Sequence, residues 1–365
     1  MLQVKIKKKL GNFLLDVDFQ MDGGVFAILG ASGCGKSMTL KCIAGIERPD
    51  EGRIVLNDRV LFDSEKKINL PPQKRKVGYM FQDYALFPNM NVVQNIQAGM
   101  GRKPDPKKVR EYITGFQLGG LEHHMPAQLS GGQKQRVAMA RMLAAEPEVL
   151  LLDEPFAALD SYLKWKMEQQ MLELLQKVQA PVLFVSHSRD EVYRLCDTVS
   201  CINQGRMEVI EPVKEFFRNP KTKTAALLSG CKNICAVEAM ESHKDGKWLW
   251  ASDWGVVIRV SKEALQARTI GIRAHFFIQE KPSEGCYSEF PVGEYRIMED
   301  PFEWNVSFRK DKSCEWLQWK TAKTDWDPSE GVPEKLYVKE ENLMLLDSDT
   351  DNRGGEKQPM DQGQA

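Results

Sequence analysis

Hydrophobic residues in the first 228 positions form short continuous runs, separated by stretches whose apolar residues have a helical spacing. The runs are "VFAILG" from Val25, "VGYMF" from Val77, "VLLLDE" from Val149 and "PVLFVSH" from Pro181. Continuous apolar runs are typical of strands buried on both faces, and alternation with helices indicates parallel strands joined by crossover helices. The pattern therefore predicts an α/β domain over residues 1–228.

The stretches 131–145 and 161–178 have the helical patterns. In the second stretch, apolar residues recur at spacings of three, four and seven, at Leu163, Met167, Met171, Leu174, Leu175 and Val178. This spacing places them on one face of a helix. We interpret that face as a stripe packed against the core.

The pattern changes after "NPKTKTAALLSG", which ends at Gly230. Seven of the eight tryptophans follow residue 230, and alternating runs such as "WGVVIRV", "RTIGIRA", "EWNVSF" and "KLYVKEENLMLL" are separated by turn-rich segments. Alternation of this kind predicts a smaller, mostly β domain over residues 232–346. The segment 347–365 has almost no apolar residues, so we expect it to be disordered.

Composition supports a globular chain and narrows the classes of partner. The 365 residues are 42% apolar and 28% charged, enough for two domains. Fifty basic and 51 acidic residues give a net charge of -1, which does not favour nucleic acid as a partner. No apolar run approaches the ~20 residues that span a bilayer, and the N-terminus lacks a signal core, so we expect a soluble, cytosolic chain. The eight cysteines lack zinc-like spacing and are interpreted as reduced thiols.

A glycine-rich stretch follows the first apolar run and precedes a helical pattern. It fits the P-loop pattern G-x-x-x-x-G-K-[ST] in the required strand-to-helix context. Glycines allow backbone N–H groups to surround phosphate oxygens, a lysine reaches the β and γ phosphates, and a serine hydroxyl meets Mg²⁺. The predicted nucleotide contacts are Gly30, Ala31, Ser32, Gly33, Cys34, Gly35, Lys36, Ser37 and Met38.

Two acidic residues follow the buried run that begins at Val149. Asp153 is placed to meet Mg²⁺ through the water shell of the ion, and Glu154 is placed to polarise the attacking water. Two acids at the end of a strand are also compatible with simple solvation. The P-loop upstream favours the catalytic interpretation, because each motif supplies the context that the other requires.

A glycine pair opens the helical stretch 131–145, in the order Leu129-Ser130-Gly131-Gly132-Gln133. Ser130 is a plausible N-cap, which would be a purely structural role. Glycines beside a cap reduce helix stability, so they are better explained by close approach of backbone N–H groups to an anion. Since the P-loop already holds one face of a nucleotide, this second helix end would serve a nucleotide bound to another copy of the chain.

Taken together, "GASGCGKS", "LSGGQ", "LLLDEP", "AALD" and "VSHSRDE" resemble the ATPase subunits of ABC transporters, over residues 1 to about 228. The resemblance implies an ABC-type P-loop NTPase fold with ATP and Mg²⁺ as cofactors. It also implies a head-to-tail dimer, in which two ATP molecules lie between the P-loop of one subunit and the LSGGQ stretch of the other.

The resemblance also implies roles for single residues. Ser130, Gly132 and Gln133 would contact the partner's ATP, and Asp160 of "AALD" would cross the dimer interface. Gln82 matches the Q-loop glutamine, which touches Mg²⁺ and the lytic water. His187 matches the switch histidine, a partner of the γ-phosphate and the catalytic water. In isolation a glutamine after a strand is usually a surface residue, and such a histidine is more often structural.

Two further expectations concern ATP itself. An aromatic residue upstream of the P-loop should stack on the adenine, with Phe13 as the candidate and Phe19 as a second possibility. Each catalytic position is of the active type, namely Lys36, Asp153, Glu154 and His187. We therefore expect hydrolysis in addition to binding.

The chain has one ATPase unit, no spanning segment and no long coiled coil, which fits a separate importer subunit better than an exporter. The second domain is similar in position to the OB-like TOBE domain of maltose, spermidine, sulfate and molybdate importers. The stretch from "GRIVLNDRV" to "NVVQNI", together with "LGNFLLDVDF" and "GCKNI", most resembles the molybdate branch. "TIGIRAHFF" resembles the strand "GIRPHDI" of these domains, from which Ala274 and Phe276 depart.

The resemblance implies three partners: a second copy, an integral membrane permease and, indirectly, an external solute-binding protein. It places the chain on the cytoplasmic face of the membrane as a peripheral subunit. Molybdate is the expected solute, and sulfate or another solute is the alternative. Two other classes stay open: a nucleotide-switched regulatory module that senses a ligand, and a soluble ABC ATPase that acts on nucleic acid or ribosomes.

Overall fold

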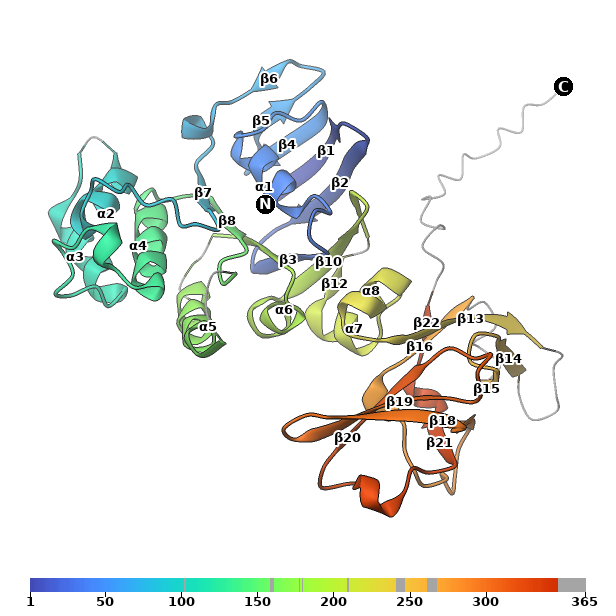
Figure 1. Ribbon diagram of the computed structural model, residues 1–365. Helices are drawn as coiled ribbons and strands as arrows, with labels where there is room; N and C mark the ends of the chain where they lie inside the picture. Colours follow the sequence, from blue (N-terminus) through green and yellow to red (C-terminus); the bar gives the residue numbers. More distant parts are fainter. Residues whose placement is uncertain are drawn as a thin grey trace, which may run out of the picture. The chain divides into compact units, whose positions relative to one another are not determined.

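The computed structural model divides into two compact units, Met1–Glu215 and Phe216–Ala365 (Figure 1). The residues that it describes are 1–101, 103–157, 161–176, 178, 180–208, 210–240, 247–260 and 268–346. The domain boundaries at 228 and 232 stay predictions, and the expected disorder of 347–365 falls outside the described residues.

The first unit is built on one large mixed sheet. Across the sheet the strands are β6 (Ile68–Asn69), β5 (Arg59–Asp63), β4 (Glu51–Leu56), β1 (Leu2–Leu10), β2 (Phe13–Met21), β11 (Arg206–Met207), β10 (Thr198–Asn203), β3 (Val25–Leu29), β9 (Val182–Ser186), β8 (Val149–Asp153) and β7 (Val77–Met80), with β12 (Glu211–Pro212) beside β10. The strands β10, β3, β9, β8 and β7 are parallel, whereas β5, β4, β1 and β2 pair antiparallel.

Helices α2, α3 and α4 pack against one another (Figure 1). The helices of the first unit are α1 (Lys36–Ala44), α2 (Val92–Met100), α3 (Pro106–Gly115), α4 (Gly131–Ala144), α5 (Ser161–Leu175) and α6 (Arg189–Leu195), with 3₁₀ turns η1 (Pro72–Lys74) and η2 (Pro126–Gln128); the boundary between the units falls within α7 (Val213–Arg218).

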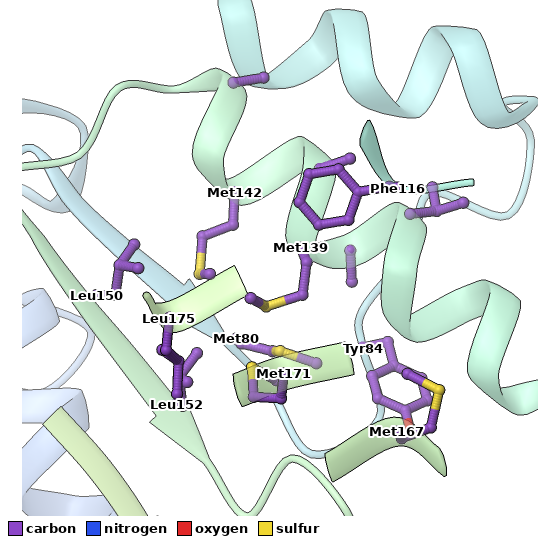
Figure 2. Packing of buried hydrophobic residues seen from close by; sticks show 14 of the residues in the cluster. Met80, Tyr84, Phe116, Met139, Met142, Leu150, Leu152, Met167, Met171 and Leu175 are labelled. Atoms are coloured by element: carbon purple, nitrogen blue, oxygen red, sulfur yellow. The ribbon is translucent and has the colours of Figure 1, made fainter. Parts of the chain in front are cut away.

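The parallel strands are buried on both faces. In β8, Leu150 and Leu152 belong to a hydrophobic cluster with α2, α4 and α5, part of which is shown in Figure 2. Val149 and Leu151 belong to a second cluster with α1, β1, β2 and β4. Because consecutive side chains of a strand point to opposite faces, a strand covered on both sides must be apolar at every position. This explains the continuous apolar runs in the sequence.

The end of α1 is fixed by a fully buried arginine, Arg75. Its guanidinium Nη1 donates hydrogen bonds to the carbonyl oxygens of Cys42 and Ile43, each at 2.8 Å, and Nε donates to the carbonyl of Leu70 at 2.8 Å. The last carbonyls of a helix have no partner within the helix, and a cation there is favourable. Arg75 therefore anchors α1, whose first residue is Lys36.

The second unit is rich in strands. Its sheets are β15-β14-β13-β16-β22, β17-β21 and β18-β19-β20. Its elements are α8 (Lys223–Leu228), β13 (Asn233–Ala239), β14 (Lys247–Ala251), β15 (Val256–Val260), β16 (Thr269–Ile272), η3 (Ala274–Phe276), β17 (Tyr287–Pro291), β18 (Glu294–Glu299), β19 (Glu303–Arg309), β20 (Leu317–Ala322), η4 (Pro328–Glu330), β21 (Lys335–Lys339), η5 (Glu340–Asn342) and β22 (Leu343–Leu346).

The tryptophans of the segment near 290–330 have structural roles in the second unit. Trp319 and Trp326 are buried in its core, with ring centroids 4.9 Å apart. Trp316 stacks against two guanidinium groups, those of Arg296 at 4.7 Å and Arg309 at 4.5 Å. These contacts account for the unusual number of tryptophans in this part of the sequence.

The observed elements confirm the predicted fold class, an α/β unit followed by a smaller strand-rich unit. The four apolar runs are β3, β7, β8 and β9, and the stretches 131–145 and 161–178 contain α4 and α5. On α5, Met167, Met171 and Leu175 are buried as the stripe requires. The antiparallel strands β1, β2, β4 and β5 were not among the predicted parallel units. Among the described residues, no helix is long and apolar enough to span a membrane.

Candidate active site

The P-loop connects β3 to α1 and wraps around the ammonium group of Lys36. Lys36 is only 4% exposed, and its Nζ donates hydrogen bonds to the carbonyl oxygens of Gly30 at 2.8 Å and Ala31 at 2.9 Å. Ala31, Ser32 and Gly33 are exposed, Cys34 is buried, and Gly35, Ser37 and Met38 are half-buried. Burial raises the pKa of the Cys34 thiol, so it stays protonated at neutral pH.

Two P-loop glycines have backbone angles that other residues rarely adopt. Gly33 has φ +80° and Gly35 has φ +111°. A Cβ on Gly35 would lie 2.6 Å from Leu15 Cδ1 and 3.3 Å from Phe13 Cζ, whereas one on Gly33 would have open space around it. The loop thus packs closely against the start of β2 at Gly35 only.

Gly35→Ala is expected to destabilise the protein more than Gly33→Ala. Both changes introduce the strain of a left-handed backbone, about 1–2 kcal/mol, and Gly35→Ala adds an overlap with buried Leu15 of about 1–3 kcal/mol. Urea unfolding of the two variants measures the difference. If the two variants have equal free energies of unfolding, the side chains of β2 move aside for the added methyl group at Gly35 without loss of stability.

Asp153, the last residue of β8, connects this strand to the P-loop helix α1 and to the neighbouring strand β7. It is buried at the end of β8, where its Oδ1 accepts a hydrogen bond from Ser37 Oγ at 2.7 Å. Its Oδ2 accepts one from the Tyr79 hydroxyl on β7 at 2.8 Å. Burial, with the Asp153 charge as a second cause, raises the pKa of Tyr79, so the phenol stays a neutral donor. The sequence predicted Ser37 and Asp153 but not Tyr79.

Glu154 is the centre of a charged group. One carboxylate oxygen, Oε1, lies 3.7 Å from Lys36 Nζ, and the other, Oε2, lies 3.1 Å from His187 Nδ1. Glu154 has φ +44°, a strained angle for a residue with a side chain, and its N–H donates to the Val185 carbonyl at 3.0 Å. Strained backbone of this kind gathers at functional sites. Three predicted catalytic residues, Lys36, Glu154 and His187, are thus brought together.

The side chain of His187 is 57% exposed. The turn that contains it is supported by a network of buried polar groups. Ser186 Oγ donates to Glu191 Oε2 at 2.6 Å and accepts from the Ser188 N–H at 2.9 Å. The other carboxylate oxygen of buried Glu191 lies 2.5 Å from Nζ of Lys164 on α5. The network joins α5, α6 and the end of β9. None of its members was predicted from the sequence, because α5 and α6 meet only in the fold.

The LSGGQ stretch forms the first turn of α4. Ser130 Oγ accepts from the Gln133 N–H at 3.3 Å, while Gln133 Oε1 accepts from the Ser130 N–H at 2.8 Å. This reciprocal pair is a capping box, which confirms Ser130 as an N-cap. Gly131 and Gly132 are the first two helical residues, where no side chain shields the backbone N–H groups.

The remaining predicted site residues lie as follows. Gln82 is exposed in the turn after β7, and because Met80 pairs with Leu152, that turn leaves the sheet at the same edge as Asp153. Phe13 is half-buried next to Gly35, as described above. Phe19 is buried, with its ring 5.2 Å from that of Phe26. Asp160 lies outside the described residues.

The donor set at Ser37 and Asp153 fits Mg²⁺. A hydroxyl and a carboxylate oxygen are the hard ligands that Mg²⁺ prefers, and protein Mg²⁺ sites often use one or two carboxylates together with substrate phosphates. Among the described residues, no group of three or more His, Cys, Asp and Glu could hold a metal ion. A cation here would therefore depend on the nucleotide for further ligands.

Comparison with known proteins places this site in a family. Residues 14–157 match the family model described as "ABC transporter". The chain is 37% identical over 282 residues to "Molybdenum import ATP-binding protein ModC" of Paramagnetospirillum magneticum, covering 75% of this chain and 77% of the relative. This chain belongs to the ABC transporter family. The matched residues of the ABC protein include Lys36, Asp153 and Glu154.

Other relatives of the ABC protein match over a shorter length. It is 42% identical over 221 residues to the protein of the same name from Aliivibrio fischeri, covering 60% of each chain. It is also 42% identical over 241 residues to "Fe(3+) ions import ATP-binding protein FbpC" of Haemophilus influenzae, covering 63% of this chain and 68% of the relative.

A solved structure agrees with the fold of the ABC protein's first unit. It is the dimeric ATP-binding cassette MJ0796 in a post-hydrolysis state with ADP and Pi, which aligns with TM-score 0.50 and 27% identity over 58% of this chain and 99% of that one.

Proposed function

We propose that this chain is the ATP-hydrolysing subunit that powers import of molybdate through a separate membrane permease. The main support is the convergence of Lys36, Glu154 and His187 beside the Ser37–Asp153 pair. A relative that aligns with this chain over 77% of its own length is named for molybdenum import. Family membership and this geometry together favour an enzyme over a purely nucleotide-sensing module.

Hydrolysis would proceed by attack of a water molecule on the γ-phosphorus of ATP. The water oxygen forms the new P–O bond, the bond to the β–γ bridging oxygen breaks, and Glu154 is placed to take up the water proton. Lys36 exchanges its contacts with the Gly30 and Ala31 carbonyls for β- and γ-phosphate oxygens. Ser37 and Asp153 would hold Mg²⁺, which neutralises the developing charge. His187 and Gln82 would orient the water and the γ-phosphate.

The complete site would need a second copy of the chain. Ser130, Gly131, Gly132 and Gln133 would present the start of α4 to the partner's ATP, where backbone N–H groups favour an anion. Asp160 would cross the interface, and Phe13, beside Gly35, would stack on the adenine. The dimeric state of the aligned ATP-binding cassette supports this arrangement.

Transport would use the difference in ATP affinity between the open and the closed dimer, because a ligand that binds both states equally shifts neither. Closure of the dimer would be transmitted to the permease by the region after β7, about residues 82–98. We place the subunit on the cytoplasmic face of the membrane, where an external solute-binding protein acts on it only through the permease.

Molybdate is favoured over other solutes by the named relatives, and ferric ion is the second candidate because of the relative named for iron import. Uptake of labelled molybdate into vesicles that contain the chain, its permease and its binding protein tests this choice. We expect ATP-dependent uptake that resists excess sulfate and ferric ion. A complex that hydrolyses ATP without taking up molybdate would leave the ATPase in place and refute the substrate.

Lys164→Met is expected to lower kcat for ATP about tenfold with little change in KM. Loss of the Lys164–Glu191 ion pair loosens the turn that contains His187, and small displacements of a catalytic group are costly in rate. Lys164→Arg should restore kcat, and Lys166→Met, the same change at an exposed neighbour, should have no effect. A variant whose kcat stays at the wild-type value would show that the network does not position His187.

A further inference from the structure

The turn that contains Gln82 is followed directly by strained backbone. The Tyr84 N–H donates to the Phe81 carbonyl at 2.9 Å, which closes a four-residue turn with Gln82 and Asp83 at its centre. Tyr84 has φ +62° and Ala85 has φ +41°. This left-handed conformation is unfavourable for residues with a side chain, and neither tyrosine nor alanine is among the types that tolerate it best. Two such residues in succession persist only where their surroundings hold them.

Arg141 of α4 is the side chain that holds the two strained residues. Its Nη1 donates to the Ala85 carbonyl at 2.8 Å, and its Nη2 donates to the Tyr84 carbonyl at 3.0 Å. The same guanidinium lies over the ring of Phe87, with its central carbon 5.0 Å from the ring centroid. A flat ion with two parallel donors that also stacks on an aromatic ring is a combination that arginine provides and lysine does not.

The next part of the chain is held by α2. The side chain of Asn95, which is fully buried, accepts from the Phe87 N–H at 3.0 Å and donates to the Phe87 carbonyl at 3.2 Å. Helix α2 in turn lies directly against α4, because a Cβ on Gly99 would be only 2.1 Å from the Arg141 carbonyl oxygen. Residues 84–87 are therefore attached to the helix pair α2 and α4.

The start of the turn is attached to the sheet instead. The ring centroid of Phe81 lies 4.4 Å from that of Tyr79, whose hydroxyl donates to Asp153. Gln82 thus lies between two attachments, the sheet edge that bears Asp153 and the guanidinium of Arg141. Without the guanidinium, the strained residues would relax toward ordinary backbone angles, and Gln82 would move with them.

We propose that Arg141 is a positioning residue for Gln82. By holding Tyr84 and Ala85 in their strained conformation, it keeps Gln82 in the turn from which that side chain would orient the attacking water. This inference rests on the proposed ATP hydrolysis and deepens it. The first turn of α4 would serve the ATP of the partner copy, whereas Arg141, farther along the same helix, would serve the ATP of its own chain.

Arg141→Met is expected to lower kcat for ATP about tenfold, because small displacements of a catalytic group are costly in rate. It should also raise the Mg²⁺ concentration for half-maximal turnover at least threefold, with unchanged affinity for a fluorescent ATP analogue. Arg110→Met, the same change at an exposed residue of α3, should leave all three values unchanged. Arg141→Lys keeps the charge but not the paired donors, so it should lower kcat at least threefold, and it replaces Arg141→Met if that variant does not fold.

Relief of the strain provides a test that a purely structural role of Arg141 would not pass. Glycine adopts positive φ at little cost, so Ala85→Gly should allow the turn to keep its shape with less support. Combined with Arg141→Met, it should raise kcat at least threefold over Arg141→Met alone. Ala145→Gly, at an exposed residue with φ −78°, should give no such rescue in the same background.

Hydrogen exchange at the amides of residues 82–87 monitors the turn independently of turnover. Exchange should be faster in Arg141→Met than in Arg110→Met. The proposal would be overturned by wild-type kcat in both Arg141 variants, by unchanged exchange, or by equal rescue from the two glycine changes. If the unmodified chain hydrolyses no ATP, the proposed function is wrong, and hydrogen exchange still decides whether Arg141 holds the turn.

Discussion

Glu154→Gln is expected to lower ATP turnover by about 10²–10⁴-fold, while ATP binding is kept. The carboxylate lies 3.7 Å from Lys36 Nζ and 3.1 Å from His187 Nδ1, in the position from which it would take up the proton of the attacking water. Glutamine has nearly the same shape and preserves the surroundings, but its amide is not a useful base. Because hydrolysis no longer resets the dimer, the variant should accumulate as an ATP-bound dimer.

Phosphate release and size-exclusion chromatography with ATP measure the two halves of this prediction. Glu146→Gln, the same change at an exposed residue, serves as a control and should behave as the unmodified chain. Turnover of Glu154→Gln within a few-fold of the control would remove Glu154 as the base.

The second large effect is expected from Lys36→Met, which should weaken ATP binding by about 100-fold. The Lys36 ammonium is held at the centre of the P-loop by two carbonyl oxygens and would exchange them for phosphate oxygens. Hydrogen bonds to charged groups contribute about 1.5–3 kcal/mol each, which corresponds to this loss of affinity.

Titration with a fluorescent ATP analogue measures the change in affinity. Lys41→Met, on the same helix but outside the loop, should bind as the unmodified chain does. Because Lys36 is buried, unfolding by urea should be followed in parallel, so that a loss of affinity is distinguished from a loss of fold. Unchanged nucleotide affinity in folded Lys36→Met would refute the assignment of the P-loop.

The central residues of the site could be predicted because they lie at the ends of buried strands or shortly after them. Ser37 lies at the start of α1, which the P-loop connects to the end of β3. Asp153 is the last residue of β8, and Glu154 comes directly after it. Parallel strands present their carboxyl ends at one edge of the sheet. The contact between Ser37 and Asp153, 116 positions apart, was therefore implied by two local patterns.

Other contacts of the site could not be predicted from the sequence and are visible only in the folded chain. Tyr79 reaches Asp153 because β7 pairs with β8 in one particular register, and Lys164 reaches Glu191 because α5 packs beside α6. Neither register nor helix packing has a local signal in the sequence. Strand β1, with its alternation of lysines and apolar residues, pairs antiparallel with β2, a pairing that the continuous apolar runs of the parallel strands do not indicate.

The dependence of ATP turnover on chain concentration tests the proposed shared site most directly. If each ATP is held between the P-loop of one copy and the LSGGQ turn of another, phosphate release per chain should rise with concentration and then level off, and chelation of Mg²⁺ should abolish it. Turnover per chain that is constant at all concentrations would show that one copy is sufficient, and would contradict the shared site.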